Sequence, residues 1–347
     1  MAQTTISDLW TPAIWIQGAT ERARAFPSLL NSGVIQRTAF FDGLASGAGT
    51  AANVPFFKDI TDDSDSIQVE DTAPTNGEIT AGTQVCPILN RVKSYDVTAL
   101  SAQVSGASPD PLSEILGQIG VGRTKRQQAT FINILRGAFG GGDTAKDGAS
   151  ALSTLRLEYF DEAGTNPPAE NKMSADLFIA AKYRLGELAD GLSGGAILTH
   201  PNICAQLEIL DKESFKDGVE SGLPFKVRTY RGIPIFVSNS LYRAGTTSGS
   251  VFETYILGNG VVGMGMKPQS SNVGDVASMI LDETQIAKNN VAVYDRNRYA
   301  IHLNGMKWVG TPGGQSATDA ELATATNWEL VYSNADRVGG VLIRTNG

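Results

Sequence analysis

The pattern of apolar and polar positions is dominated by one long stretch with helical spacing, residues 108–142. Asp110 suits the cap of such a helix, Pro111 suits its first position, and the glycines at 140–142 can end it. Apolar side chains recur on one face near both ends of the stretch: Leu112, Leu116, Ile119, Phe131, Leu135 and Ala138. We therefore expect one long helix within residues 108–142. Two helices broken near the glycines of 120–122 are the alternative, because glycine weakens a helix interior.

The region before this helix has the pattern of extended structure. Residues 53–60 and 83–100 favour β-strands, and the segment 61–82 between them is acidic and rich in turn-forming residues. An isolated two-stranded ribbon is barely stable in water. We therefore expect this ribbon to lie on another surface.

Residues 1–50 show little periodicity but carry several large aromatic side chains. These are Trp10, Trp15, Phe40 and Phe41. Apolar side chains on an irregular terminal segment usually require a surface that covers them. The same subunit or a neighbour could provide it, and we expect that neighbouring subunits order this segment.

The chain after the long helix mixes short helices and strands. Ser174 can cap a helix, a buried strand AILT follows, and Pro201 begins a further short helix. A hairpin with its turn at Arg231 and Gly232 comes next, and residues 279–303 alternate as long paired strands. Two more strands are expected in the tail.

Composition narrows the possible classes of protein. The net charge of −8 argues against a protein held to nucleic acid by phosphate contacts, but it suits a surface that lies near DNA without adhering to it. The low share of charged residues, 18%, and the 38 glycines suggest much buried contact area and many loops, as in an oligomer subunit. The two cysteines, Cys86 and Cys204, are expected to be free thiols. No apolar run has the length of a membrane span.

Motifs that could carry catalysis lack the structural context that they need. Residues 191–195 match the G-x-S-x-G pattern around Ser193, but the expected order is helix, loop, strand, and only His200 and His302 could complete a triad. Residues 258–263 match G-x-G-x-x-G, yet no helix is expected after them. We therefore expect no enzyme, no catalytic site and no cofactor.

An acidic run approximates the spacing of a calcium-binding loop: Asp59, Thr61, Asp63, Asp65 and Glu70. Ser64 stands where that loop requires glycine, and flanking helices are not expected. We expect a solvated acidic segment and no metal site.

The order of these pieces resembles the major capsid proteins of tailed bacteriophages, which share the Hong Kong 97-type fold. The resemblance rests on FPSLLNSGVIQR, NVPFFKDI, the long helix DPLSEILGQIGVGRTKRQQATFINILRGAFG, ILTHPNICAQL and YRGIPIFVSN, in that order. It implies an α+β fold with an N-terminal arm (1–52), an extended E-loop (53–106) and a P domain with a spine helix (107–169). An A domain (170–277), the long strands of the P domain (278–308) and C-terminal strands returning to the A and P core (309–347) would follow.

The resemblance also implies a function. Such subunits form hexamers and pentamers that close into an icosahedral shell around packaged double-stranded DNA in the virion, after assembly in the cytoplasm of a bacterial host. A scaffold, a portal and decoration proteins would be the partners, with no sequence-specific DNA binding and no membrane. The alternatives are an encapsulin-like nanocompartment shell, a tail or decoration protein, and a hydrolase.

We expect specific contacts between subunits. The aromatic residues Trp10, Trp15, Phe40 and Phe41 would meet neighbours. The acidic E-loop segment, with Asp62, Asp63 and Asp65, would dock on the basic middle of a neighbour's long helix, with Arg123, Lys125 and Arg126. The alternative is that both segments are merely solvated faces.

Overall fold

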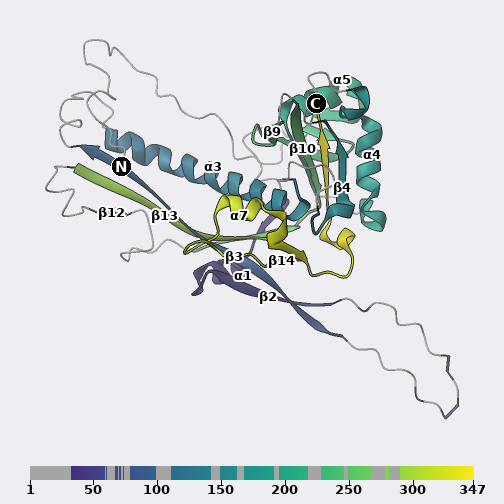
Figure 1. The fold of residues 1–347 in the computed structure, drawn as a ribbon, viewed down its shortest axis with the longest axis horizontal. Coiled ribbons are helices and arrows are strands. Elements are labelled where there is room, and N and C mark those ends of the chain that lie inside the picture. The colour runs from purple at the N-terminus through teal and green to yellow at the C-terminus, as the bar shows by residue number, and fades with distance from the viewer. Residues whose placement is uncertain are drawn as a thin grey trace.

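The computed structural model describes residues 33–58, 60, 67–68, 70–71, 73, 79–98, 111–141, 149–161, 168–190, 195–217, 228–245, 249–267, 278–280 and 290–347. One long helix, α3 (Pro111–Phe139), spans 29 residues and runs alongside a long sheet (Figure 1). The prediction of a single helix is thus confirmed, and the alternative with a break at 120–122 is wrong. Gly140, with φ of 71°, follows the helix in the left-handed conformation that commonly ends helices. The expected cap, Asp110, lies outside the described residues.

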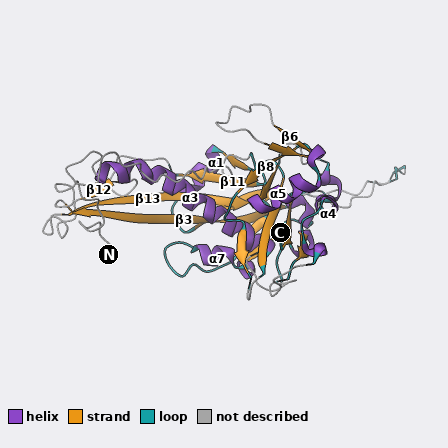
Figure 2. Cartoon of the chain, turned by 90° about the horizontal axis from the view of Figure 1, so that it is seen from above, coloured by secondary structure: helices purple, strands orange, loops and turns teal. Residues whose placement is uncertain are grey.

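The long sheet contains six strands. Its order is β1 (Ile35–Arg37), β11 (Val262–Met266), β13 (Asn290–Leu303), β3 (Ala81–Thr98) and β2 (Ala51–Phe57), with β12 (Ser278–Ile280) also paired to β13. β1 is parallel to β11, and the other pairs are antiparallel. Figure 2 shows α3 lying along β3 and β13. The predicted long paired strands at 279–303 and the predicted ribbon before the helix are both present.

The structure has two bodies. The first contains α3 and the long sheet, and the second is built on an eight-stranded sheet. Its order is β4 (Arg156–Tyr159), β16 (Gly340–Thr345), β10 (Ser250–Leu257), β5 (Ala196–Thr199), β8 (Ile233–Val237), β7 (Arg228–Tyr230) and β6 (Phe215–Asp217), with β9 (Tyr242–Ala244) paired to β10. Helices α4 (Ala175–Tyr183) and α5 (Pro201–Leu210) belong to this body (Figure 1). Residues 306–330 add β14 (Met306–Trp308), α7 (Asp319–Ala323) and β15 (Trp328–Leu330), and α7 packs on α3.

Short 3₁₀ helices connect these elements: η3 (Ser153–Leu155), η4 (Ala169–Asn171), η5 (Gly186–Ala189), η6 (Lys212–Ser214), η7 (Ala325–Asn327) and η8 (Ala335–Val338). Local signals in the sequence placed several elements correctly. The Ser174 hydroxyl accepts the Leu177 N–H at the start of α4. Arg231 and Gly232 both have positive φ, as a tight hairpin turn requires.

Sheet membership differs from the expected domain boundaries at two places. β4, expected before the A domain begins at 170, pairs with β16 in the second sheet, and β11, expected within the A domain, lies in the long sheet. One hydrophobic core joins both sheets through the C-terminal half of α3, where Phe131 and Leu135 are fully buried. The two bodies therefore share packing at that end of the helix.

The N-terminal segment is ordered by its own chain from Gly33 onward. α1 (Ala39–Ser46) packs on β11 and β13, and Phe41 is only 8% exposed. The Asp42 carboxylate accepts the Met266 N–H at 2.8 Å. The prediction that neighbours alone order residues up to 50 is therefore wrong for 33–50, because α1 packs on β11 and β13 of its own chain. Phe40 is half exposed, and its contact with a neighbour stays a prediction, whereas Trp10 and Trp15 lie outside the described residues.

Two glycines of β11 allow this close approach. A Cβ at Gly265 would lie 2.0 Å from the Phe41 carbonyl carbon, and one at Gly263 would lie 2.0 Å from the Phe41 ring. We expect Gly265→Ala to lower the free energy of unfolding by about 2 kcal/mol, because backbone must shift to admit the methyl group. Gly43→Ala is the control: Gly43 lies in α1 with open space around it, so alanine should not destabilise the chain. Urea unfolding of the unassembled subunit measures both, and equal midpoints would contradict the expectation.

Candidate assembly site

The predicted basic cluster lies on the face of α3 that covers the long sheet. The guanidinium groups of Arg123 and Arg126 both form ion pairs with Asp295 of β13, whose side chain is fully buried. Arg123 Nε donates to Asp295 Oδ1 at 3.1 Å, and Arg126 also donates to the Tyr95 hydroxyl at 3.4 Å. The two arginines therefore fix the helix to the sheet within one chain.

This arrangement corrects the interpretation of the cluster. Their basic run suggested that Arg123 and Arg126 bind a neighbour's acidic segment, but within the described residues their acidic partner is Asp295 of the same chain. Lys125, beside them, is half-buried. The proposed acidic partners Asp62, Asp63 and Asp65 lie outside the described residues, so contacts of these groups between subunits stay a prediction.

A second ion pair connects α3 to the other body. Arg136 Nε donates to both carboxylate oxygens of Glu253 on β10, at 3.0 and 2.9 Å, and Arg136 also donates to the Ser240 carbonyl at 2.9 Å. Glu253 is fully buried, and this burial raises the pKa of its carboxyl even though Arg136 opposes the shift. The hydroxyl of Tyr255 lies beside Glu253, and burial raises its pKa well above the ordinary value. The α3 helix is thus fixed to both sheets by buried charges.

The ribbon that the resemblance predicts as the E-loop is described over β2, the start of β3 and a few residues between these strands. Its large apolar side chains are unusually exposed: Phe57 by 77%, Ile60 by 56%, Ile67 by 89% and Ile79 by 61%. Between Ala81 and Pro87 the only pairing partner of β3 in the described residues is β2. The ribbon therefore presents apolar surface that nothing in the described chain covers.

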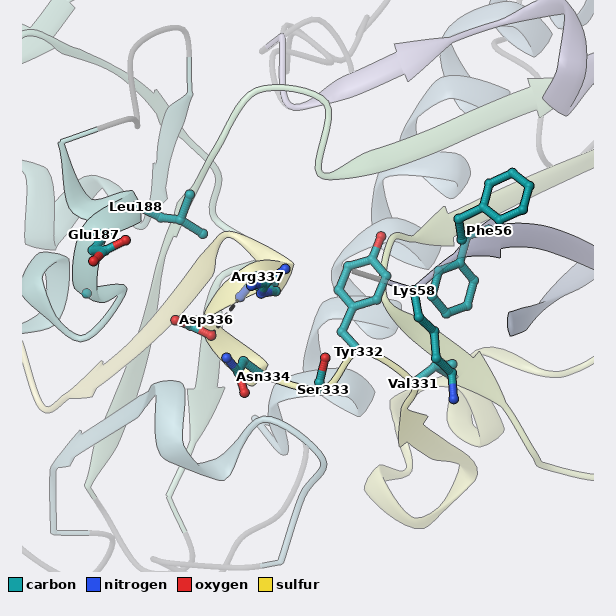
Figure 3. A pocket seen from close by; sticks show the side chains of 12 residues that line it. Phe56, Lys58, Glu187, Leu188, Val331, Tyr332, Ser333, Asn334, Asp336 and Arg337 are labelled. Atoms are coloured by element: carbon teal, nitrogen blue, oxygen red, sulfur yellow. Dashed lines mark hydrogen bonds between the residues drawn. The ribbon is translucent and has the colours of Figure 1, made fainter. Parts of the chain in front are cut away.

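A groove of about 920 Å³ lies where this ribbon joins the rest of the molecule. One wall comes from η5, with Glu187 and Leu188, and the other from the end of β2, with Phe56 and Lys58 (Figure 3). The segment 331–337 forms the floor. No sequence pattern predicted this groove, because three distant segments build it and only the adjacent pair of phenylalanines at its edge indicated an exposed surface.

The sequence predicted no catalysis at the motifs around His200 and residues 258–263. In the structure, these residues have structural roles. His200 caps α5: its Nδ1 accepts the Asn202 N–H at 3.2 Å. Residues 258–261 connect β10 to β11, and residues 262 and 263 begin β11, so a strand stands where a dinucleotide site needs a helix. Ser193 lies outside the described residues, as does most of the acidic run 59–70. In the described ranges there is no group of metal-ligating side chains, Cys86 and Cys204 are free, and no helix is long and apolar enough to cross a membrane.

Solved structures with similar architecture include phage capsids and an encapsulin. The chain aligns with the capsid of Ralstonia phage GP4 at a TM-score of 0.57 and 11% identity, covering 97% of this chain and 96% of that one. It aligns with the capsid of cyanophage Pam1 at 0.55 and 11%, covering 100% and 99%. An encapsulin from Synechococcus elongatus gives 0.51 and 12%, covering 100% and 96%. These likenesses define the fold: the chain has the α+β Hong Kong 97-type fold of capsids and encapsulins.

Sequence comparison distinguishes between these two kinds of shell. The chain is 26% identical over 337 residues to the major capsid protein of Bacillus phage SPP1, covering 96% of this chain and 95% of that protein. No family model matches the chain. This likeness, over nearly the whole of both chains, supports a major capsid protein of a tailed bacteriophage. The encapsulin alternative has weaker support, because that likeness concerns the fold alone.

Proposed function

We propose that the chain assembles as hexamers and pentamers that close into an icosahedral shell around packaged double-stranded DNA. The observation that carries this proposal is the E-loop ribbon, whose exposed side chains include Phe57 and Ile67. A two-stranded ribbon with such side chains gains stability only when another surface buries them. In a capsid, the next copy of the chain provides that surface.

We propose the following domain division. An N-terminal arm (1–52) precedes the E-loop (53–106); the P domain comprises α3 and the long sheet, and the A domain comprises the second sheet with α4 and α5. Contacts of β4 and β11 across the expected boundaries support a P and an A domain that share one core. Scaffold, portal and decoration proteins would be further partners. The net charge of −8 favours a shell that encloses DNA without binding it by sequence.

Electron microscopy of the purified chain, produced with its scaffold, tests this proposal. We expect closed shells from the full chain. Replacing residues 58–80 by a short glycine turn should abolish shells but leave a folded subunit, because β2 and β3 remain paired at their inner ends. A full chain that stays monomeric or dimeric with its scaffold, or an E-loop deletion that forms normal shells, would contradict the proposal.

A further inference from the structure

We propose that the α4 pocket, a cavity between α4, the end of η5 and the β7–β8 turn, binds an apolar group that carries a carboxylate. None of the residues that line this pocket belongs to the E-loop ribbon or to α3. The inference therefore goes beyond the contacts that build the shell.

The floor of the α4 pocket is apolar and preformed. Phe178 and Ile233 line it and are only 1% and 7% exposed. Phe178 packs edge-to-face on Tyr230, with ring centroids 4.9 Å apart, and this contact holds its ring in place. The volume of about 520 Å³ lies within the range of about 300–1,000 Å³ that is typical of ligand sites. The pocket can therefore enclose an apolar group such as a phenyl ring.

The first of two cations at the pocket is Lys182. Its Nζ lies 3.3 Å from Asp190 Oδ1, in an ion pair whose carboxylate is 82% exposed. Exposed pairs of this kind contribute little to stability, so Lys182 can turn toward the carboxylate of a ligand at small cost. Asp190 also lines the pocket, where it opposes the binding of an anion.

The second cation, Arg231, occupies a backbone position that arginine does not favour. It has a φ of 50° and precedes Gly232, with a φ of 83°, in the two-residue turn of the β7–β8 hairpin. Asparagine or aspartate suits the first position of such a turn, whereas other side chains adopt it at a cost. The ion pair of Arg231 with Asp211 is partly exposed, at 38% and 19%, so it offsets little of that cost. We therefore assign the guanidinium of Arg231 at the pocket to ligand binding.

The guanidinium of Arg231 is held in place and keeps donors for a ligand. Its Nε donates to the Tyr230 hydroxyl at 3.4 Å, and its Nη2 donates to Asp211 Oδ2 at 3.0 Å. The Ser214 hydroxyl in turn donates to Asp211 Oδ1 at 2.8 Å, which fixes the carboxylate. Within the described residues Nη1 contacts no acceptor, so its protons can reach the oxygen of a bound carboxylate.

These features define the chemistry of the ligand. An apolar group would fill the floor while its carboxylate meets Lys182 and Arg231. Two cations and one acid line the pocket, so it favours an anion over a cation. A free organic acid and a protein segment with neighbouring apolar and acidic residues share this chemistry, and binding of a peptide probe distinguishes the two sources.

Ligand-observed NMR on the unassembled full chain tests the inference. N-acetylphenylalanine carries both features, its amide lacks the charge, and N-acetylglycine lacks the apolar side chain. We expect saturable binding of N-acetylphenylalanine and about fivefold weaker binding of its amide, because the amide loses a charge contact. N-acetylglycine should bind more weakly still. The acetylated amide of phenylalanyl-glutamate carries its acid on the next side chain: tighter binding than N-acetylphenylalanine indicates a protein segment, and equal or weaker binding indicates a free acid.

Variants with opposite expected effects show whether binding occurs in the α4 pocket. Lys182→Gln and Arg231→Asn should each weaken binding of N-acetylphenylalanine about fivefold, and asparagine suits the backbone of the turn. Asp190→Asn removes the opposing carboxylate and should strengthen binding about threefold. Lys172→Gln is the matched control, since Lys172 is exposed and lies outside the pocket, and it should change nothing.

Three results would overturn the inference. The first is no saturable binding of N-acetylphenylalanine. The second is equal binding of the acid and its amide, which would indicate apolar contact alone. The third is a loss in Lys172→Gln as large as that in Lys182→Gln, which would indicate general attraction to a lysine-bearing surface. Circular dichroism of each variant verifies that it is folded, so a loss of binding reports on the pocket.

Discussion

Replacing Asp295 with asparagine should lower the free energy of unfolding by about 3 kcal/mol, because it leaves two arginines on α3 without the carboxylate that neutralises them. Asp295 is fully buried, whereas the Arg123 and Arg126 side chains are 15% and 38% exposed. Removing one partner of a buried pair costs about 3–5 kcal/mol, and the partial exposure of the arginines places this site at the lower end. Urea unfolding of the unassembled subunit, followed by circular dichroism, measures the loss.

Asp190→Asn is the matched control for this substitution. Asp190 pairs with Lys182 at 3.3 Å, but its side chain is 82% exposed. Exposed ion pairs contribute about 0–1 kcal/mol, so the control should change stability only slightly. If Asp295→Asn costs no more than Asp190→Asn, the buried ion pair does not fix α3 to the long sheet.

Elements specified by local signals were predictable from the sequence. The helix α3 follows from apolar spacing, α4 from the Ser174 cap, α5 from Pro201, and the β7–β8 hairpin from its turn residues. In each case the signal lies within a few residues of the structure that it specifies. The order of such pieces along the chain was sufficient to indicate the capsid fold.

Features that depend on long-range pairing could not be predicted. The partner of Arg123 and Arg126 comes from β13, far along the chain, so their basic run looked free for a neighbour. The α1 helix docks because Gly263 and Gly265 leave space for Phe41, and a glycine in a strand does not reveal which segment approaches it. The groove had no sequence signal of its own, since its walls and floor come from three segments.

Acid should destabilise the subunit through His302, a fully buried side chain of β13 that contacts Gln84 of β3. His302 Nε2 lies 2.6 Å from Gln84 Oε1 on β3, and the same oxygen accepts the Gly305 N–H at 3.0 Å. Since that oxygen only accepts hydrogen bonds, Nε2 carries the proton of the neutral ring. His302 Nδ1 is buried without a hydrogen-bond partner, so a second proton there would find no acceptor.

This environment fixes the sign of the pH dependence. Burial lowers the pKa of His302 from 6.5 to about 4. Above pH 6.5 the ring is neutral in both the folded and unfolded chains, so it contributes no pH dependence. Between pH 6.5 and pH 4, His302 is protonated in the unfolded chain but neutral in the folded chain. As the pH falls through this window, the free energy of unfolding should therefore fall by about 3 kcal/mol. Below pH 4 both states are protonated and the contribution levels off.

The substitution His302→Gln separates the contribution of His302 from that of carboxyl groups, which titrate in a similar pH range. A glutamine amide can still donate to Gln84 Oε1 but does not titrate. The difference in unfolding free energy between the unsubstituted subunit and this variant should therefore change by about 3 kcal/mol from pH 7 to pH 4. His200→Gln is the control, since His200 caps α5 and burial lowers its pKa while leaving it partly accessible, so most of the acid sensitivity should remain. If the unfolding free energy of His302→Gln depends on pH as that of the unsubstituted subunit does, the buried imidazole does not control the acid stability of the subunit.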